Sequence, residues 1–245
     1  MANEAVWLLT AAVFAAAALY AAVGHGGASA YIALMALWGL SPEEIRPAAL
    51  VLNIVVAGVG AYHFVRAGRF DGGVFWPFAI TAIPAAYLAG GVDVPEVFYR
   101  PLLALALGAA ALRYLLWPQL DALRVTNAPG KAVALPAGVA LGALAGLTGI
   151  GGGVYLSPLL VFMGWADARK ATGIAACFIV ANSAAGLAGR MSSLASLPDF
   201  LPWLVLAAGL GALVGAAASL KLFDAKGVLR VLGVVLGIAA AALVS

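Results

Sequence analysis

The stretch LAGLTGIGGGVYLSPLLVFMG, from Leu144 to Gly164, decides how this chain is expected to fold. It is apolar, yet four glycines stand within the five residues from Gly149 to Gly153. Glycine tolerates backbone conformations that other residues avoid, so this run predicts a break in a helix at membrane depth. The next segment, 153–165, has only 13 residues. At about 1.5 Å per residue it reaches about 20 Å, short of a hydrocarbon core of about 30 Å.

The same arrangement occurs near the start of the chain, in YAAVGHGGASAYIALMALWG, from Tyr20 to Gly39. A glycine turn at 24–27 precedes a second short segment, 28–40. An offset of 124 residues brings Arg66 onto Arg190, each near the end of the long helix that follows. This correspondence predicts an internal repeat.

The composition is that of an integral membrane protein. Hydrophobic residues make up 65% of the 245 residues and charged residues only 9%, against about 25% charged in soluble proteins. Glu4 stands where a signal peptide would be basic, so we expect the first helix to be retained. Full-length helices are predicted at 47–66, 72–91, 98–117, 170–189, 200–219 and 226–244, with marginal ones at 6–23 and 132–148.

The predicted architecture is an all-α, polytopic transmembrane bundle of two repeats, each with a glycine-rich broken or re-entrant helix pair. Repeat 1 covers 1–118, a cytoplasmic loop covers 119–130, and repeat 2 covers 131–245. Ten of the thirteen Lys and Arg residues fall on one side, which is therefore cytoplasmic and leaves both termini outside the inner membrane. An odd number of crossings per repeat inverts the second copy, whether the short pairs are hairpins or tilted spans.

The two glycine turns are the first candidate binding site. A helix that starts after such a turn presents free N–H groups and a positive partial charge, which suits an anion. Two inverted turns would point toward one central point. Close packing of helices through small residues is the structural alternative. The candidate residues are Gly24, Gly26, Gly27, Gly149, Gly151, Gly152 and Gly153.

Polar side chains near the turns are further candidates for contact with a substrate. His25 lies inside the first turn, where it could contact a ligand, handle a proton, or bond a backbone carbonyl. Asn53 and Asn182 lie within long helices and could bond a substrate oxygen or hold helices together. Ser29 and Thr148 flank the turns and could donate to an anion or cap a helix.

Several classes of function lack the residues that they need. Every Asp and Glu is predicted in a loop or at a helix end, which disfavours a cation pathway. No P-loop, HExxH, GxSxG or paired-carboxylate motif occurs, so we expect no catalytic residues, metal or cofactor. The basic residues are scattered singly and predict no nucleic-acid partner.

Both quoted stretches resemble the sulfite exporter TauE/SafE family, also called the toluene sulfonate uptake permease family, in which a Gly-x-Gly-Gly turn follows the first helix of each repeat. The resemblance covers essentially the whole chain. It implies transport of a small sulfur-containing anion such as sulfite, a sulfonate or sulfoacetate. It also implies that Gly24, Gly26, Gly27, Gly149, Gly151 and Gly152 lie close to the substrate.

We therefore expect a secondary transporter of a small sulfur oxyanion, embedded in lipid and working by alternating access. The alternatives are an anion channel, a membrane enzyme or subunit acting on lipid phosphate, and a structural subunit of a complex. The GxxxG spacings at 211–215 and 233–237 fit either a homodimer contact or packing within the chain.

Overall fold

The structure is a computed structural model that describes residues 3–22, 25–116, 129–191, 196–218, 230, 233–234, 236–238 and 240–241. Across these residues the regular structure is helical and no β-strand occurs, which confirms the all-α class. Gly24, most of the loop 119–130 and part of the predicted helix 226–244 lie outside the described residues. The helices are α1 (Asn3–Ala22), α2 (Ala28–Leu37), α3 (Pro42–Arg66), α4 (Gly72–Gly90), α5 (Glu96–Leu116), α6 (Lys131–Thr148), α7 (Gly153–Phe162), α8 (Ala168–Gly189) and α9 (Leu201–Ala218).

The two short helices are shorter than the sequence predicts. Helices α2 and α7 have 10 residues each and end at 37 and 162, rather than at 40 and 165. The reason is that Gly39 and Gly164 take positive φ angles of 79° and 68° just beyond the helix ends. A left-handed glycine at this position turns the chain away and ends the helix.

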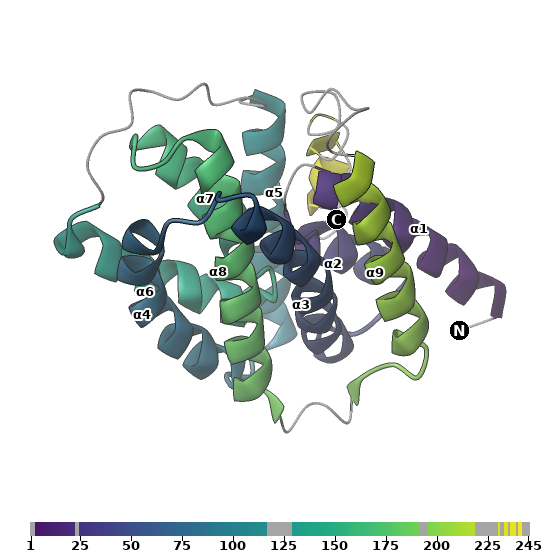
Figure 1. The fold of residues 1–245 in the computed structure, drawn as a ribbon. Helices are drawn as coiled ribbons and strands as arrows, with labels where there is room; N and C mark the ends of the chain where they lie inside the picture. Colours follow the sequence, from purple (N-terminus) through teal and green to yellow (C-terminus); the bar gives the residue numbers. More distant parts are fainter. Residues whose placement is uncertain are drawn as a thin grey trace.

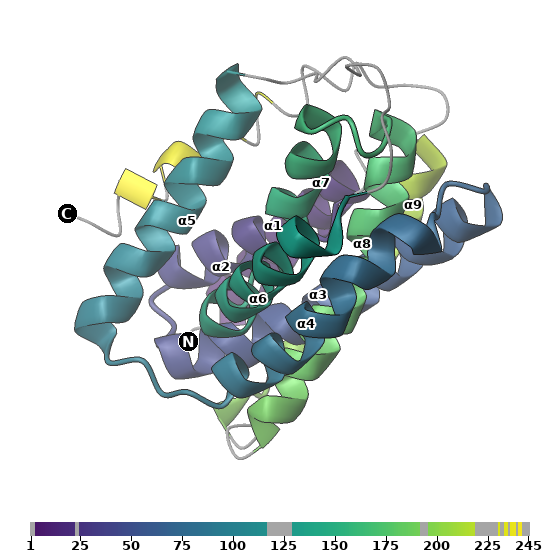
Figure 2. The same ribbon diagram turned by 90° about the vertical axis from the view of Figure 1, so that its left-hand side faces the viewer.

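The long helices form three layers (Figure 1). Helices α3 and α8 pack against each other in the middle, α4 and α6 pack together on one side, and α1 and α9 on the other. The two halves correspond to the predicted repeats, so the first half contains α1 to α5 and the second begins with α6. Helices α1 and α6 are then the first helices of their halves, and α4 and α9 are the fourth. The first helix of each half therefore packs on the fourth helix of the other half. Figure 2 shows α5 along a separate flank.

Helices α3 and α8 run in opposite directions. Asn53 of α3 contacts Ser183 of α8, and further along α3 Gly60 lies beside Ala176. Residue numbers therefore rise along α3 as they fall along α8. Because the two helices hold the same place in the two halves, opposite directions are what an inverted duplication requires. The inversion across a membrane stays a prediction.

Glycines set how closely the outer pairs of helices approach. A Cβ atom on Gly138, Gly142 or Gly146 of α6 would collide with the main chain of α4. Gly211 and Gly215 of α9 pack in the same way on the main chain of α1. This close approach is typical of small residues spaced four apart in membrane helices.

The GxxxG spacings that could have served a homodimer are thus occupied within the chain. The first is buried in the α1–α9 contact described above. In the second, Gly233 and Gly237 lie against Leu115 and Ala111 of α5. The homodimer stays a prediction, and the buried pair Gly211 and Gly215 supplies no surface for it.

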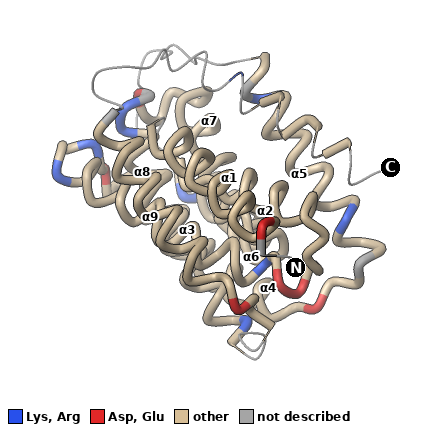
Figure 3. Tube along the Cα trace, turned by 90° about the vertical axis from the view of Figure 1, so that its right-hand side faces the viewer, with Lys and Arg blue, Asp and Glu red and all other residues tan. Residues whose placement is uncertain are grey.

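Five of the described helices, α1, α3, α4, α6 and α8, are long and apolar enough to cross a membrane. Two of these, α1 and α6, are the helices that the sequence marks as marginal. Figure 3 shows charged residues near helix ends and in connecting turns, with long uncharged stretches between them. This distribution is the one that a lipid environment requires.

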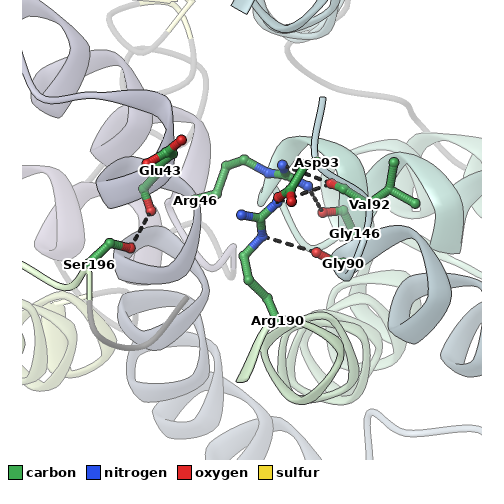
Figure 4. Close-up of polar contacts among 8 residues, drawn as sticks. All are labelled: Glu43, Arg46, Gly90, Val92, Asp93, Gly146, Arg190 and Ser196. Carbon is green, nitrogen blue, oxygen red and sulfur yellow. Dashed lines mark hydrogen bonds and ion pairs between the residues drawn. The ribbon is translucent and has the colours of Figure 1, made fainter. Parts of the chain in front are cut away.

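Helix α3 begins at Pro42, five residues before the predicted start at 47, and this shift moves Arg46 into the helix. Ser41 and Glu44 form a capping box, with Ser41 Oγ accepting from Glu44 N and Glu44 Oε2 accepting from Ser41 N. Pro47 has no N–H and cannot donate to Glu43 O one turn back. Ser196 Oγ donates to that carbonyl at 3.0 Å, which keeps the proline tolerable (Figure 4).

Substituting Gly142→Ala should destabilise the protein, because the added Cβ would meet Ala82 Cα at 2.6 Å. Overpacking of this kind costs about 1–3 kcal/mol, so the midpoint of thermal unfolding in detergent should fall. Gly58→Ala is the matched control, since its Cβ would meet nothing within 4 Å. Equal unfolding temperatures for the two variants would contradict the close α4–α6 contact.

Candidate functional site

Residues of the two glycine turns and of α8 surround one small cavity. Its volume for the centre of a water molecule is about 10 Å³, roughly what one water requires. It is lined by Tyr20, His25, Gly26, Gly27, Ala28, Ser29, Ile150, Val154 and Ile179. Segments more than 120 residues apart in the sequence thus share one cavity.

The two short helices start in the same way. Gly27 and Gly152, with φ of 87° and 75°, are their N-cap residues, and neither start has a side-chain cap. Gly27 O accepts from Ala30 N and Tyr31 N at 3.0 and 3.1 Å. Gly152 O accepts from the equivalent N–H groups of α7 at 3.1 and 3.2 Å. Since the first N–H groups of a helix have no partner within it, both starts offer donors.

Asn53 of α3 lies where the two turns meet, and it is fully buried. Its Nδ2 donates to Ile150 O in the second turn at 3.2 Å and to Ser183 Oγ at 3.4 Å. A Cβ added to Gly26 would lie 2.9 Å from Asn53 Oδ1, and one added to Gly151 would lie 2.8 Å from Nδ2. Asn53 Oδ1 has no hydrogen-bond partner among the residues that the structure describes. One amide therefore touches both turns and keeps an unused acceptor.

The second turn is built from left-handed glycines and one threonine. Gly149, Gly151 and Gly152 have φ angles of 82°, 78° and 75°, which other residues adopt only with strain. Thr148 Oγ1 donates to Leu144 O at 2.6 Å and accepts from Ile150 N at 3.3 Å. The hydroxyl thus stabilises the turn itself, which is the capping alternative considered for this residue.

The remaining predicted residues have different surroundings. Ser29 Oγ lies 2.7 Å from Tyr20 OH, so its hydroxyl already has a partner beside the cavity. His25 donates through its main-chain N–H to Tyr20 O at 2.9 Å. Asn182 is fully buried and donates to Phe178 O, one turn back on its own helix. Gly153 packs against Ile179 and allows α7 to approach α8 closely.

Two residues of the site were missed by the sequence analysis. Ile179 lines the cavity and touches both Gly26 and Gly151, and Ser183 accepts from Asn53. They lie four residues apart on α8, so they share one face of the helix. Their four-residue spacing predicts a shared helix face, but nothing local in the sequence identifies that face as the one toward the turns.

The chemistry available here is hydrogen bonding without negative charge. The turns supply backbone N–H groups at two helix starts, and none of the side chains that line the cavity carries a carboxylate. Within the described part of the chain, no three His, Cys, Asp or Glu side chains gather to hold a metal ion. Such a site is suited to a small anion.

Comparisons with known proteins agree with this architecture. The family model described as sulfite exporter TauE/SafE matches residues 9–243. A curated relative, the "Probable membrane transporter protein y4hK" of Sinorhizobium fredii (strain NBRC 101917 / NGR234), is 38% identical over 239 residues, covering 96% of each chain. No solved structure matches. The chain is a multi-pass membrane transporter protein, and it belongs to the TauE/SafE sulfite exporter family.

Proposed function

We propose that this protein is a secondary transporter of a small sulfur-containing anion, such as sulfite, a sulfonate or sulfoacetate, that binds between the two glycine turns. The observation that carries the proposal is the meeting of two uncapped helix starts at Asn53. Their positive partial charges face one small cavity with no carboxylate in its lining. The family name points to the same class of anion.

Movement of the halves is part of this proposal. The cavity has room for about one water, and a sulfur oxyanion has several heavy atoms. The two turns must therefore separate before a substrate enters. Each turn belongs to a different half of the chain, so separating the halves would open the site, as alternating access requires. The predicted orientation, with both termini outside, belongs to the same proposal.

Substituting Gly151→Ala should reduce transport at least about tenfold, corresponding to about 1.4 kcal/mol. The added Cβ would strain a backbone at φ of 78° and press on Asn53 Nδ2 and Ser183 Oγ. Gly68→Ala is the matched control, because its φ is 69° but its Cβ would meet nothing within 4 Å. Efflux from proteoliposomes loaded with sulfite, sulfoacetate, taurine, sulfate or acetate measures the effect.

The same assay separates a carrier from the alternatives. A carrier gives saturable flux that the same anion on the opposite side accelerates, whereas an anion channel gives no such acceleration. Modification of lipid phosphate in the vesicles without anion flux would instead favour the enzyme alternative. Absence of flux for every sulfur anion, in protein shown to be folded, would contradict the proposal.

Asn53→Leu should destabilise the folded protein by about 1–3 kcal/mol, because Ile150 O loses the amide that donates to it. Asn182→Leu is the control, since it removes an equally buried amide whose bond lies within its own helix. Thermal unfolding in detergent should show the larger drop for Asn53→Leu. We also expect its sulfite flux to fall, as the two turns lose their shared contact. Equal behaviour of the two variants would mean that Asn53 does not hold the junction.

A further inference from the structure

Two arginines are buried at one end of the bundle. The predicted helices 47–66 and 170–189 leave Arg46 and Arg190 just outside their ends, yet each side chain is only 3% exposed. Arg46 lies in the second turn of α3, and Arg190 is the C-cap residue of α8. Because α3 and α8 run in opposite directions, the two side chains reach the same end. Figure 4 shows their guanidinium groups extending toward a common point beside Val92 and Asp93.

Each arginine donates to the half opposite its own, and Arg46 also donates within its own half. Arg46 Nη2 donates to Gly146 O of α6 at 3.2 Å, and its Nη1 donates to Val92 O at 3.2 Å. Arg190 donates through Nε to Gly90 O and through Nη2 to Val92 O, both at 3.0 Å. The two guanidinium groups therefore share the Val92 carbonyl. Most of these acceptors lie at helix C-termini, where arginine is a common cap.

Capping does not account for the whole arrangement. Arg190 Nη2 pairs with Asp93 Oδ1 at 3.1 Å, but the Asp93 side chain is 94% exposed. In the part of the chain that the structure describes, Arg46 donates only to neutral carbonyl oxygens, and its buried Nε has no partner. A buried charge without a counter-ion is costly. The cluster thus holds an unused donor and a cation without a carboxylate of its own.

Tyr99 lies between this cluster, the second glycine turn and an open cavity. The Tyr99 ring lies 5.6 Å from Arg46 Cζ, and Tyr99 OH donates to Thr148 O at 3.4 Å. The main chain of Arg46 also abuts Gly149. Tyr99 lines an open cavity of about 370 Å³, whose lining includes the charged residues Glu44 and Arg100. A solute in that cavity reaches Tyr99, which lies against both Arg46 and the second turn.

We infer that Arg46 and Arg190 form a second oxyanion-binding site, in which an incoming sulfonate-type or carboxylate-type anion replaces the Asp93 carboxylate. Guanidinium groups bind such anions through parallel N–H donors, and Arg46 Nε supplies a donor that no group in the described part of the chain uses. The inference rests on the proposed function, because it places this arginine pair on the path of an anion from the open cavity beside Tyr99 to the glycine turns. Binding there also changes contacts that join the two halves.

The sign of the Asp93→Asn effect tests this site. If an anion competes with Asp93, removing the carboxylate should tighten sulfite and sulfoacetate binding about two- to fivefold, the range of an exposed ion pair. Asp199→Asn is the control, because it makes the same charge change on an exposed residue outside the cluster. Isothermal titration of the purified full-length protein in detergent gives the dissociation constants. A purely structural ion pair would leave binding unchanged or weaken it.

The variant Arg46→Lys provides a second test of this site in the same titration. It keeps the charge but removes the fork of donors, so binding should weaken about tenfold or more, whereas the exposed Arg169→Lys should leave it unchanged. If Arg46→Lys does not fold, the surface variant Asp93→Asn still tests whether an anion binds at the arginine pair. Flux lost in Gly151→Ala, with no tightening in Asp93→Asn, overturns this inference and leaves the proposed function standing. A wild-type protein that neither binds nor carries these anions overturns both.

Discussion

The structure depends on satisfying backbone polar groups where helices break inside an apolar bundle. The hydrocarbon core of a bilayer holds no water, so each N–H or carbonyl freed at a break needs a partner in the protein or must face a polar cavity. In the second turn, the Thr148 hydroxyl takes the Ile150 N–H and the Asn53 amide donates to the Ile150 carbonyl. In the first turn, Tyr20 O accepts the His25 N–H. The breaks persist because other helices surround them.

The glycine contacts between helices make that enclosure possible. Close approach of α6 to α4 and of α9 to α1 leaves α3 and α8 as the central layer. Asn53 and Ser183 come from this central layer, and both belong to the junction of the turns. Packing through small residues and the geometry of the candidate site are therefore two consequences of one arrangement. The pairs α4–α6 and α1–α9 each join a helix of one half to a helix of the other. Relative motion of the halves would therefore change the junction.

The groups that could bind an anion lie in two places, at the centre of the bundle and at one end of it. The centre offers helix starts and amides, while an arginine pair lies beside the second turn. On the proposals made above, an anion would pass from guanidinium donors to backbone N–H donors. Both kinds of donor are held by contacts between the halves. Such contacts could couple occupancy by an anion to the relative position of the halves, because binding replaces bonds that join them.

Apolar composition and glycine clusters were enough to determine the helical membrane class and the places where helices break, since both are local properties of the chain. The start of α3 was also readable, because Ser41 and Glu44 form a capping-box pattern, and reading it would have placed Arg46 in the helix. Only the tertiary structure decided that Asn53 reaches Ser183, 130 residues away, and that Arg46 reaches Gly146, 100 residues away. Such contacts depend on how each helix is rotated and which neighbour it packs on, and these are set by close packing between distant segments rather than by any local pattern.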